Sequence, residues 1–104
     1  MIRVTVYRAQ NRYLGFCVSG HAGAAPSGQD LVCAAVSSAA LLTANTLAAY
    51  WDCEATQNGS LTLRIQTATP ETDAVLKGFT AHIHALEQQY PKHLKLIYGG
   101  THHA

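Results

Sequence analysis

The chain has 104 residues, the usual length of a single domain, and 48% of these residues are apolar. Charged residues make up only 12% of the chain, against about 25% in an average soluble domain, and this balance excludes intrinsic disorder. Seven Lys and Arg residues face six Asp and Glu residues, so the net charge of +1 excludes the basic field typical of nucleic-acid-binding proteins.

The same composition predicts a partner and a location. We expect a homodimer, because a chain with so few charges exposes apolar surface that a second copy can cover. The N-terminus lacks the continuous apolar segment of a signal peptide, and residues 31–50, the longest apolar stretch, are interrupted by Ser, Thr and Asn. We therefore expect a cytosolic protein without a membrane span. Three cysteines without a C-x-x-C pair argue against a disulfide framework and a zinc knuckle.

In the first half of the chain, alternating apolar and polar residues predict strands at 2–8 and 12–19, joined by a polar turn. Small residues fill 20–28 and favour a mobile loop. An Ala- and Leu-rich segment without Gly or Pro then predicts a long helix from about Asp30 to about Tyr50. Two caps are possible at its start. Ser27 and Asp30 fit a capping box, or Asp30 is itself the N-cap and Cys33 lies in the first turn.

In the second half, residues 53–57 and 60–67 flank Asn58-Gly59, a dipeptide that favours a two-residue turn in which both residues have positive φ. A second hairpin is therefore expected. Thr69-Pro70-Glu71 supplies an N-cap, a proline at the first helical position and an acid in the first turn, which together predict a second helix. Its apolar stripe would be formed by residues three or four apart, namely Val75, Phe79, Ile83, Leu86 and Tyr90.

Pro91 should end this helix, and residues 93–98 have the length and apolar content of a last strand. The predicted order is β-β-α-β-β-α-β within one domain of residues 1–104. Short loops in both hairpins imply antiparallel pairing, so we expect a two-layer α+β fold with a mainly antiparallel sheet packed against two helices.

The chemistry centres on Cys33 and His21. A thiol needs to become a thiolate to act as a nucleophile, and the positive end of a helix lowers the pKa of a thiol placed there. Cys33 lies close to such a helix start. Imidazole titrates near neutral pH and can take and return a proton, so His21, twelve residues before Cys33, is the candidate base. Folding of the small-residue segment between them would allow the two side chains to meet.

Structural roles compete with this interpretation. A cysteine in an Ala-rich helix is more often a small buried side chain than a nucleophile, and we assign Cys17 and Cys53 to packing for this reason. Asp30 is more often a helix cap than a catalytic group. Ser37, one turn after Cys33, more often binds its own helix backbone.

Two segments carry a family resemblance. Gly20-His21-Ala22-Gly23 and Asp30-Leu31-Val32-Cys33-Ala34-Ala35-Val36-Ser37 resemble, in residues and in spacing, the signature of the ribosomal-processing cysteine protease family, Prp. The resemblance extends over the whole chain, although its specific part is this His-loop-Cys block.

The resemblance implies an enzyme that removes a short N-terminal extension from a large-subunit ribosomal protein, the twenty-seventh in the conventional naming. Cys33 would be the nucleophile and His21 the base, with Asp30 and Ser37 as supporting groups and with no cofactor. Because the family cleaves beside paired phenylalanines, it also implies a groove for an extended peptide. The glycines of the predicted loop would allow it to order only when substrate arrives; they are Gly20, Gly23 and Gly28.

Two other functions remain open at the level of sequence. The chain could be a non-catalytic, ribosome-associated binding module of the same fold in which Cys33 is simply buried. A metal-dependent hydrolase would use His21 and Cys33 as ligands, but the acids are scattered and no H-x-x-x-H motif supplies further ligands. We therefore predict no metal site.

Overall fold

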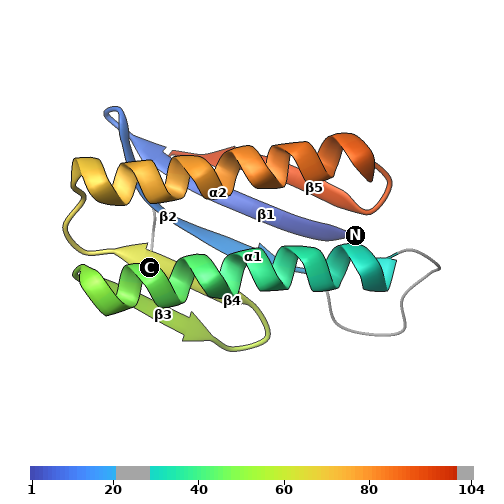
Figure 1. Cartoon of the computed structure of the whole chain (residues 1–104). Coiled ribbons are helices and arrows are strands. Elements are labelled where there is room, and N and C mark those ends of the chain that lie inside the picture. Colours follow the sequence, from blue (N-terminus) through green and yellow to red (C-terminus); the bar gives the residue numbers. More distant parts are fainter. Residues whose placement is uncertain (21–28, 101–104) are drawn as a thin grey trace.

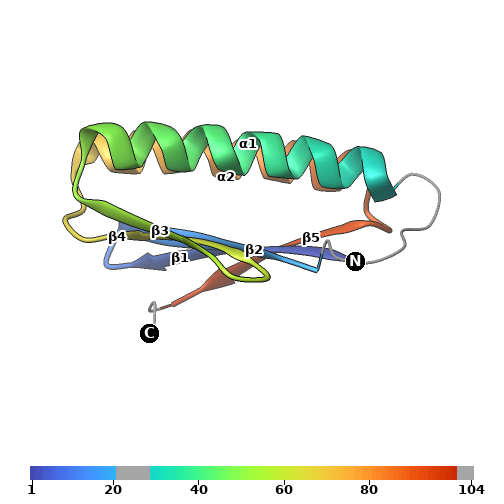
Figure 2. The same cartoon turned by 90° about the horizontal axis from the view of Figure 1, so that it is seen from below.

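The computed structural model describes residues 1–20 and 29–100 of the chain. Five strands form one sheet, and both helices lie side by side on one face of it (Figures 1 and 2). The elements in chain order are β1 (Ile2–Ala9), β2 (Arg12–Ser19), α1 (Gln29–Tyr50), β3 (Cys53–Gln57), β4 (Leu61–Ile65), α2 (Pro70–Gln89) and β5 (Leu94–Gly99). The predicted two-layer α+β fold and its element order are confirmed.

The sheet has the strand order β3-β4-β2-β1-β5. Its two hairpins, β1–β2 and β3–β4, are antiparallel, and β4 pairs antiparallel with β2. In contrast, β5 pairs parallel with β1, because α2 carries the chain back along the sheet before β5 begins. The sheet is thus mainly antiparallel, as predicted, with one parallel pair at an edge.

The core lies between the sheet and the two helices. Helix α1 faces it with apolar residues three or four apart, which are fully or almost fully buried: Val32, Val36, Ala40, Ala44 and Leu47. Phe16 of β2 stacks on Phe79 of α2, with ring centroids 4.3 Å apart, and joins sheet to helix. By length and composition alone α1 is also apolar enough to cross a membrane; in this fold it covers the sheet.

Helix α2 begins as predicted. Thr69 is the N-cap, and its side chain and that of Thr72 each accept a hydrogen bond from the other residue's backbone N–H, which forms a complete capping box. Pro70 is the first helical residue. The buried stripe differs from the predicted one, because Leu76 is fully buried with Thr72 and Thr80, while Val75, Leu86 and Tyr90 are only partly buried.

The β1–β2 hairpin contains the tight turn that the sequence suggested for the other hairpin. Gln10 and Asn11 both have positive φ, at 52° and 64°, and Ala9 pairs directly with Arg12. The pairing then shifts by one residue between Tyr7 and Arg8, which makes a β-bulge. Gly15 follows the bulge with a φ of 147°, and a Cβ there would lie 2.0 Å from the Leu63 carbonyl oxygen.

The prediction for the β3–β4 turn was wrong. Gln57 pairs with Leu61, so the loop has three residues, Asn58 to Ser60, and only Gly59 has positive φ. The two-residue turn would have paired Glu54 with Leu63 and turned this carboxylate toward the core. In the observed register Ala55 pairs with Leu63, and Glu54 pairs with Arg64 on the opposite face. The three-residue loop therefore keeps the core-facing leucines of β4 opposite Ala55 and Gln57 and leaves the Glu54 carboxylate on the other face of the sheet.

The two sheet edges differ. At the β5 edge, α2 supplies acceptors for strand amides: the Leu96 N–H donates to Glu87 Oε2 at 2.8 Å, and the Leu94 N–H donates to the Tyr90 carbonyl at 3.2 Å. At the other edge lies β3, in which residues 54–57 are all exposed. An edge whose amides are already bonded is protected from pairing with another chain.

Candidate active site

The candidate nucleophile lies close to the start of α1. The helix begins at Gln29, so Asp30 is its second residue and Cys33 its fifth. Of the two alternatives left open by the sequence, the one with Asp30 as the N-cap and Cys33 in the first turn does not hold. Ser27, the other predicted capping residue, lies outside the described residues. Asp30 is exposed in the first turn, where a carboxylate offsets the positive helix end.

The residues predicted to act together on α1 share one side of it. Asp30, Cys33 and Ser37 are spaced by three and four residues, and this spacing aligns side chains along one helix face. Cys33 and Ser37 are half-buried, and Cys33 packs against the core. The stripe thus lies at the boundary between the core and the solvent, where a side chain is held by packing and can still be reached.

A small pocket places this stripe beside β2. Ser37, Ala40 and Leu41 of α1 line it together with residues of three strands, namely Val18, Gln57 and Leu61. Sequence reasoning pointed to Ser37 but not to these strand residues, because they come together only through the β3-β4-β2 order of the sheet. The pocket lies one helical turn beyond Cys33.

Strand β2 and helix α1 run in opposite directions, so the end of the strand and the start of the helix lie at the same end of the molecule (Figure 1). Going back from Ser37 to Cys33 covers about 6 Å along the helix, and going from Val18 to Gly20 covers about 7 Å along the strand. The topology therefore brings the chain that precedes His21 to the end of α1 that carries Cys33. His21 itself lies outside the described residues.

Gly20 fixes how the chain leaves β2. Its φ is 84°, and a Cβ at this position would lie 2.3 Å from the Met1 carbonyl oxygen, so only glycine fits the turn. The predicted flexibility of the loop stays a prediction, because Gly23 and Gly28 lie outside the described residues. Gly20, by contrast, is described, and its positive φ sets the direction in which the chain leaves β2 immediately before His21.

The other two cysteines occupy different surroundings. The Cys17 sulfur accepts a hydrogen bond from the Thr62 hydroxyl at 3.4 Å, on the sheet face opposite the helices. Cys53 packs against the core at the start of β3, where burial raises the pKa of its thiol and the neighbouring Asp52 carboxylate adds to the rise. A raised pKa disfavours the thiolate. Both thiols are free.

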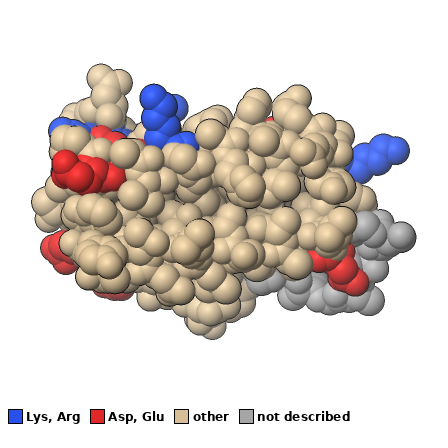
Figure 3. Space-filling view, viewed as in Figure 1, with Lys and Arg blue, Asp and Glu red and all other residues tan. Residues whose placement is uncertain are grey.

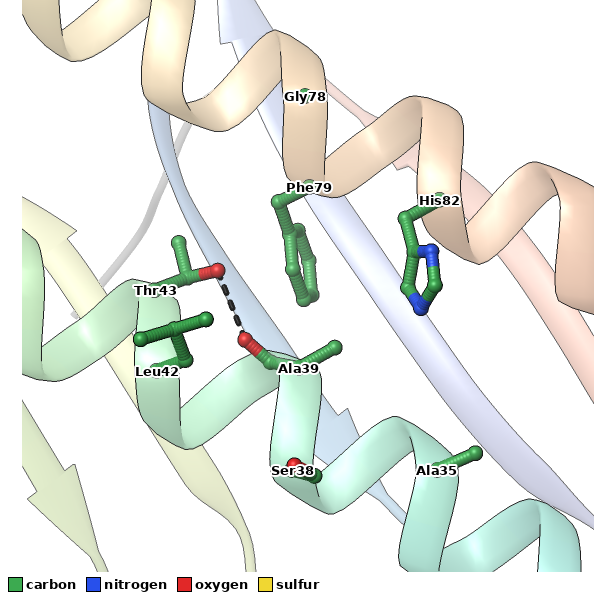
Figure 4. A pocket seen from close by; sticks show the side chains of 8 residues that line it. All are labelled: Ala35, Ser38, Ala39, Leu42, Thr43, Gly78, Phe79 and His82. Atoms are coloured by element: carbon green, nitrogen blue, oxygen red, sulfur yellow. Dashed lines mark hydrogen bonds between the residues drawn. The ribbon is translucent and has the colours of Figure 1, made fainter.

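A larger groove lies between the helices on the outer side of the helical layer. It has a volume of about 470 Å³, and Figure 4 shows Phe79 and His82 of α2 opposite Ala35 and Ala39 of α1. The Thr43 hydroxyl donates to the Ala39 carbonyl at 2.7 Å and is thus bonded within its own helix. Among the described residues that line this groove, none is a Lys, Arg, Asp or Glu.

Known proteins share this fold over its full length. SMU.848 of Streptococcus mutans is 22% identical with a TM-score of 0.84, and the match covers 97% of this chain and 96% of that one. The ribosomal processing protease Prp of Staphylococcus aureus, solved with a substrate peptide, is 18% identical with a TM-score of 0.83, over 94% of this chain and 99% of that one.

A second structure of the S. aureus protease, with a covalently linked product peptide, is 22% identical with a TM-score of 0.77 over the same shares of the two chains. No curated protein sequence matches the chain. The sequence model of the family described as cysteine protease Prp, however, matches residues 1–95. The half-buried thiol at the start of α1 thus belongs to an enzyme, and the chain is a member of the Prp family of cysteine proteases.

Proposed function

We propose that this protease removes the N-terminal extension of a large-subunit ribosomal protein, the twenty-seventh in the conventional naming. The observation that carries the proposal is the arrangement of Cys33 and Ser37 on the core-facing edge of α1, beside the end of the strand that leads to His21. The S. aureus relative of the same fold is a ribosomal processing protease that binds a substrate peptide. We infer that Cys33 and His21 of this chain hydrolyse a peptide bond in the same way.

In the proposed mechanism His21 takes the proton of the Cys33 thiol, and the thiolate attacks the carbonyl carbon of the scissile bond. His21 then gives the proton to the leaving amine, and water hydrolyses the thioester that remains on Cys33. Backbone N–H groups at the start of α1 supply the positive end of a helix close to the thiol, where negative charge develops on the substrate oxygen. Asp30 and Ser37 flank Cys33 on the same stripe as supporting groups.

The proposed substrate is an extended peptide that crosses the start of α1. A small pocket of about 30 Å³, lined by Val18, Ser37 and Leu61, lies on the path from Cys33 along the helix, and its volume has room for no more than a small group of such a peptide.

The test is cleavage of the ribosomal protein, with the new N-terminus read by mass spectrometry. We expect Cys33→Ala to abolish cleavage without loss of stability, because the change removes one half-buried sulfur from a helix start. His21→Ala should also abolish it. Cys17→Ala is the matched control, because this thiol lies on the opposite sheet face, and it should cleave at the native rate.

Two results would contradict the proposal. If Cys33→Ala kept full activity, Cys33 would not be the nucleophile. If the native enzyme cleaved a model peptide but left the tail of the ribosomal protein uncut, that protein would not be the substrate. Labelling with iodoacetamide distinguishes a protease from a binding module of the same fold. Native Cys33 should react near neutral pH, and its reaction should slow in His21→Ala.

We also propose that the protease is a homodimer in the cytosol. The outer side of the helical layer supports the dimer: Leu31 and Leu42 on α1 are 64% and 69% exposed, and Leu42 lines a groove to which the described residues contribute no Lys, Arg, Asp or Glu. Figure 3 shows few charged side chains over the middle of this face. An apolar face without charge can pair with its own copy about a two-fold axis without repulsion. Cys17, Cys33 and Cys53 form no disulfide in the described part of the chain, and this supports a reducing compartment.

A further inference from the structure

The fold gathers cations at the end of the molecule opposite to Cys33. A cavity of about 430 Å³ lies where the β1–β2 turn meets the first turns of α2, and three of the seven Lys and Arg residues of the chain line it: Arg8, Arg12 and Lys77. The turn and the start of α2 lie at the left end in Figure 1, and Figure 3 shows basic side chains there.

One acid in the cavity is already neutralised. Asp73 Oδ2 accepts a hydrogen bond from Arg12 Nη1 at 2.6 Å, and Asp73 Oδ1 accepts one from the Tyr13 backbone N–H at 3.0 Å. Because both carboxylate oxygens are engaged, Asp73 positions the Arg12 guanidinium and leaves its other N–H groups for a ligand. The cavity keeps an excess of two positive charges.

The second guanidinium is also held in place. The Cζ atom of Arg8 lies 5.1 Å from the ring centroid of Tyr13 and 5.8 Å from that of Tyr98, so rings from β2 and β5 lie within cation–π distance of it. Neither Arg8 nor Lys77 has a carboxylate partner within ion-pair distance in residues 1–20 and 29–100. A ligand would therefore not have to break an existing pair to reach them.

We propose that this cavity is a phosphate-binding site. A carboxylate presents two oxygens in one plane and is satisfied by a single guanidinium, whereas a phosphate group presents three acceptor oxygens to donors from different directions. Two fixed guanidinium groups and one ammonium group, from two strands and a helix, match the second arrangement. The volume exceeds that of one phosphate ion, so the group can be free phosphate or the phosphate of a nucleotide.

The test is a titration of the native chain followed by ¹H–¹⁵N NMR at constant ionic strength. The probes are inorganic phosphate, adenosine 5′-monophosphate, adenosine and glutarate. We expect phosphate and the nucleotide to shift the signals of Asn11 and Tyr13, which line the cavity, and adenosine to leave them unchanged. Tighter binding of the nucleotide than of phosphate would identify a nucleotide as the source of the group, and equal binding would identify the free ion.

Lys77→Gln removes one exposed cation from the cavity without touching the core, so this variant should fold, and phosphate binding should weaken about tenfold. Lys92→Gln is the matched control, because it removes the same charge from the exposed turn before β5 and should bind as the native chain does.

Equal weakening of phosphate binding in both variants would show that only the net charge of the protein matters, and this would overturn the proposal. Glutarate binding as tightly as phosphate, or adenosine shifting the same signals, would overturn it too. The phosphate site does not involve Cys33, so a failure of this proposal would leave the proposed protease function untouched, and the reverse is also true.

Discussion

At the scale of single residues, two glycines that look alike in the sequence have opposite roles. Gly15 has a φ of 147° in β2, with the Leu63 carbonyl of the neighbouring strand where its Cβ would be. Gly78 lies on the exposed side of α2 with no atom near its Cβ position. Backbone conformation and the neighbouring chain, rather than residue type, decide whether a glycine is required.

We expect Gly15→Ala to destabilise the protein by at least about 2 kcal/mol, because the new methyl group meets a carbonyl oxygen and the backbone is strained. Gly78→Ala is the control and should stabilise it by about 0.5–1 kcal/mol, the difference in helix propensity. Urea unfolding followed by circular dichroism measures both changes. A Gly15→Ala midpoint at or above the native one would contradict the structure of the bulge.

The thiols make a second prediction at this scale. Burial, with a smaller effect of Asp52, raises the pKa of Cys53, so its thiolate is scarcer at pH 8 than in the unfolded chain. We expect iodoacetamide to alkylate native Cys53 several-fold more slowly at pH 8 than the urea-unfolded chain, with the rate rising only as the pH climbs past the usual thiol pKa. Mass spectrometry of the labelled peptide gives the rate.

The raised pKa of Cys53 also makes the stability of the fold depend on pH. A thiol that is harder to deprotonate in the folded state stabilises this state at a pH below its unfolded pKa, and the contribution is lost as the pH rises through the raised pKa. Labelling of Cys53 at equal rates in the native and unfolded chain would show that its surroundings do not disfavour the thiolate.

At the scale of elements, α2 controls one edge of the sheet. The Glu87 carboxylate accepts the hydrogen bond of the Leu96 N–H, which points away from β1. We expect Glu87→Ala to destabilise the protein by about 1–2 kcal/mol, since it leaves a partly buried amide without an acceptor. Glu87→Gln keeps an acceptor oxygen and should lose less than half of this. Thermal unfolding measures both variants, and an equal loss in the two would indicate that the charge rather than the hydrogen bond matters.

Local signals in the sequence predicted elements well where they are self-contained. Thr69 and Pro70 define the start of α2 through contacts within four residues, and the structure has this start. The Asn58-Gly59 pair failed as a guide because the length of its loop is decided elsewhere, by which residues of β3 face the core opposite Leu61 and Leu63. At the start of α1 the sequence left two caps open, because Asp30 could be the cap or an acid in the first turn with equal local merit, and the structure places it in the first turn.

At the scale of the whole molecule, the long-range arrangement was beyond sequence reasoning. Nothing in residues 93–98 shows that this strand pairs parallel with β1 instead of joining another edge. For the candidate site, sequence predicted Cys33 and Ser37 but not Val18 and Leu61, which reach Ser37 through the strand order. The net charge of +1 likewise gave no sign that Arg8, Arg12 and Lys77 come together around one cavity, because a total says nothing about where charges lie.

The proposed dimer makes a prediction at this scale. Leu42→Glu places a charge on the exposed apolar side of α1, and we expect it to convert the dimer to monomer, because two such charges would meet across a two-fold axis. Thr56→Glu is the matched control, because it adds the same charge on the uncovered sheet face. Sedimentation equilibrium at micromolar concentration gives the mass. A native chain that sediments as a monomer, or a dimer unaffected by Leu42→Glu, would rule out this face.

Both helices cover the same side of the sheet, and no element of residues 1–20 and 29–100 covers the other side (Figure 2). Thr5, Thr62 and the cationic pair Arg3 and Lys95 lie on that bare side, where hydroxyl and amino groups keep their hydration shells. The described part of the molecule therefore has a mostly polar back, interrupted by the exposed Ile97, and an apolar front. Contact between two copies front to front would therefore bury more apolar surface than contact between two sheet faces.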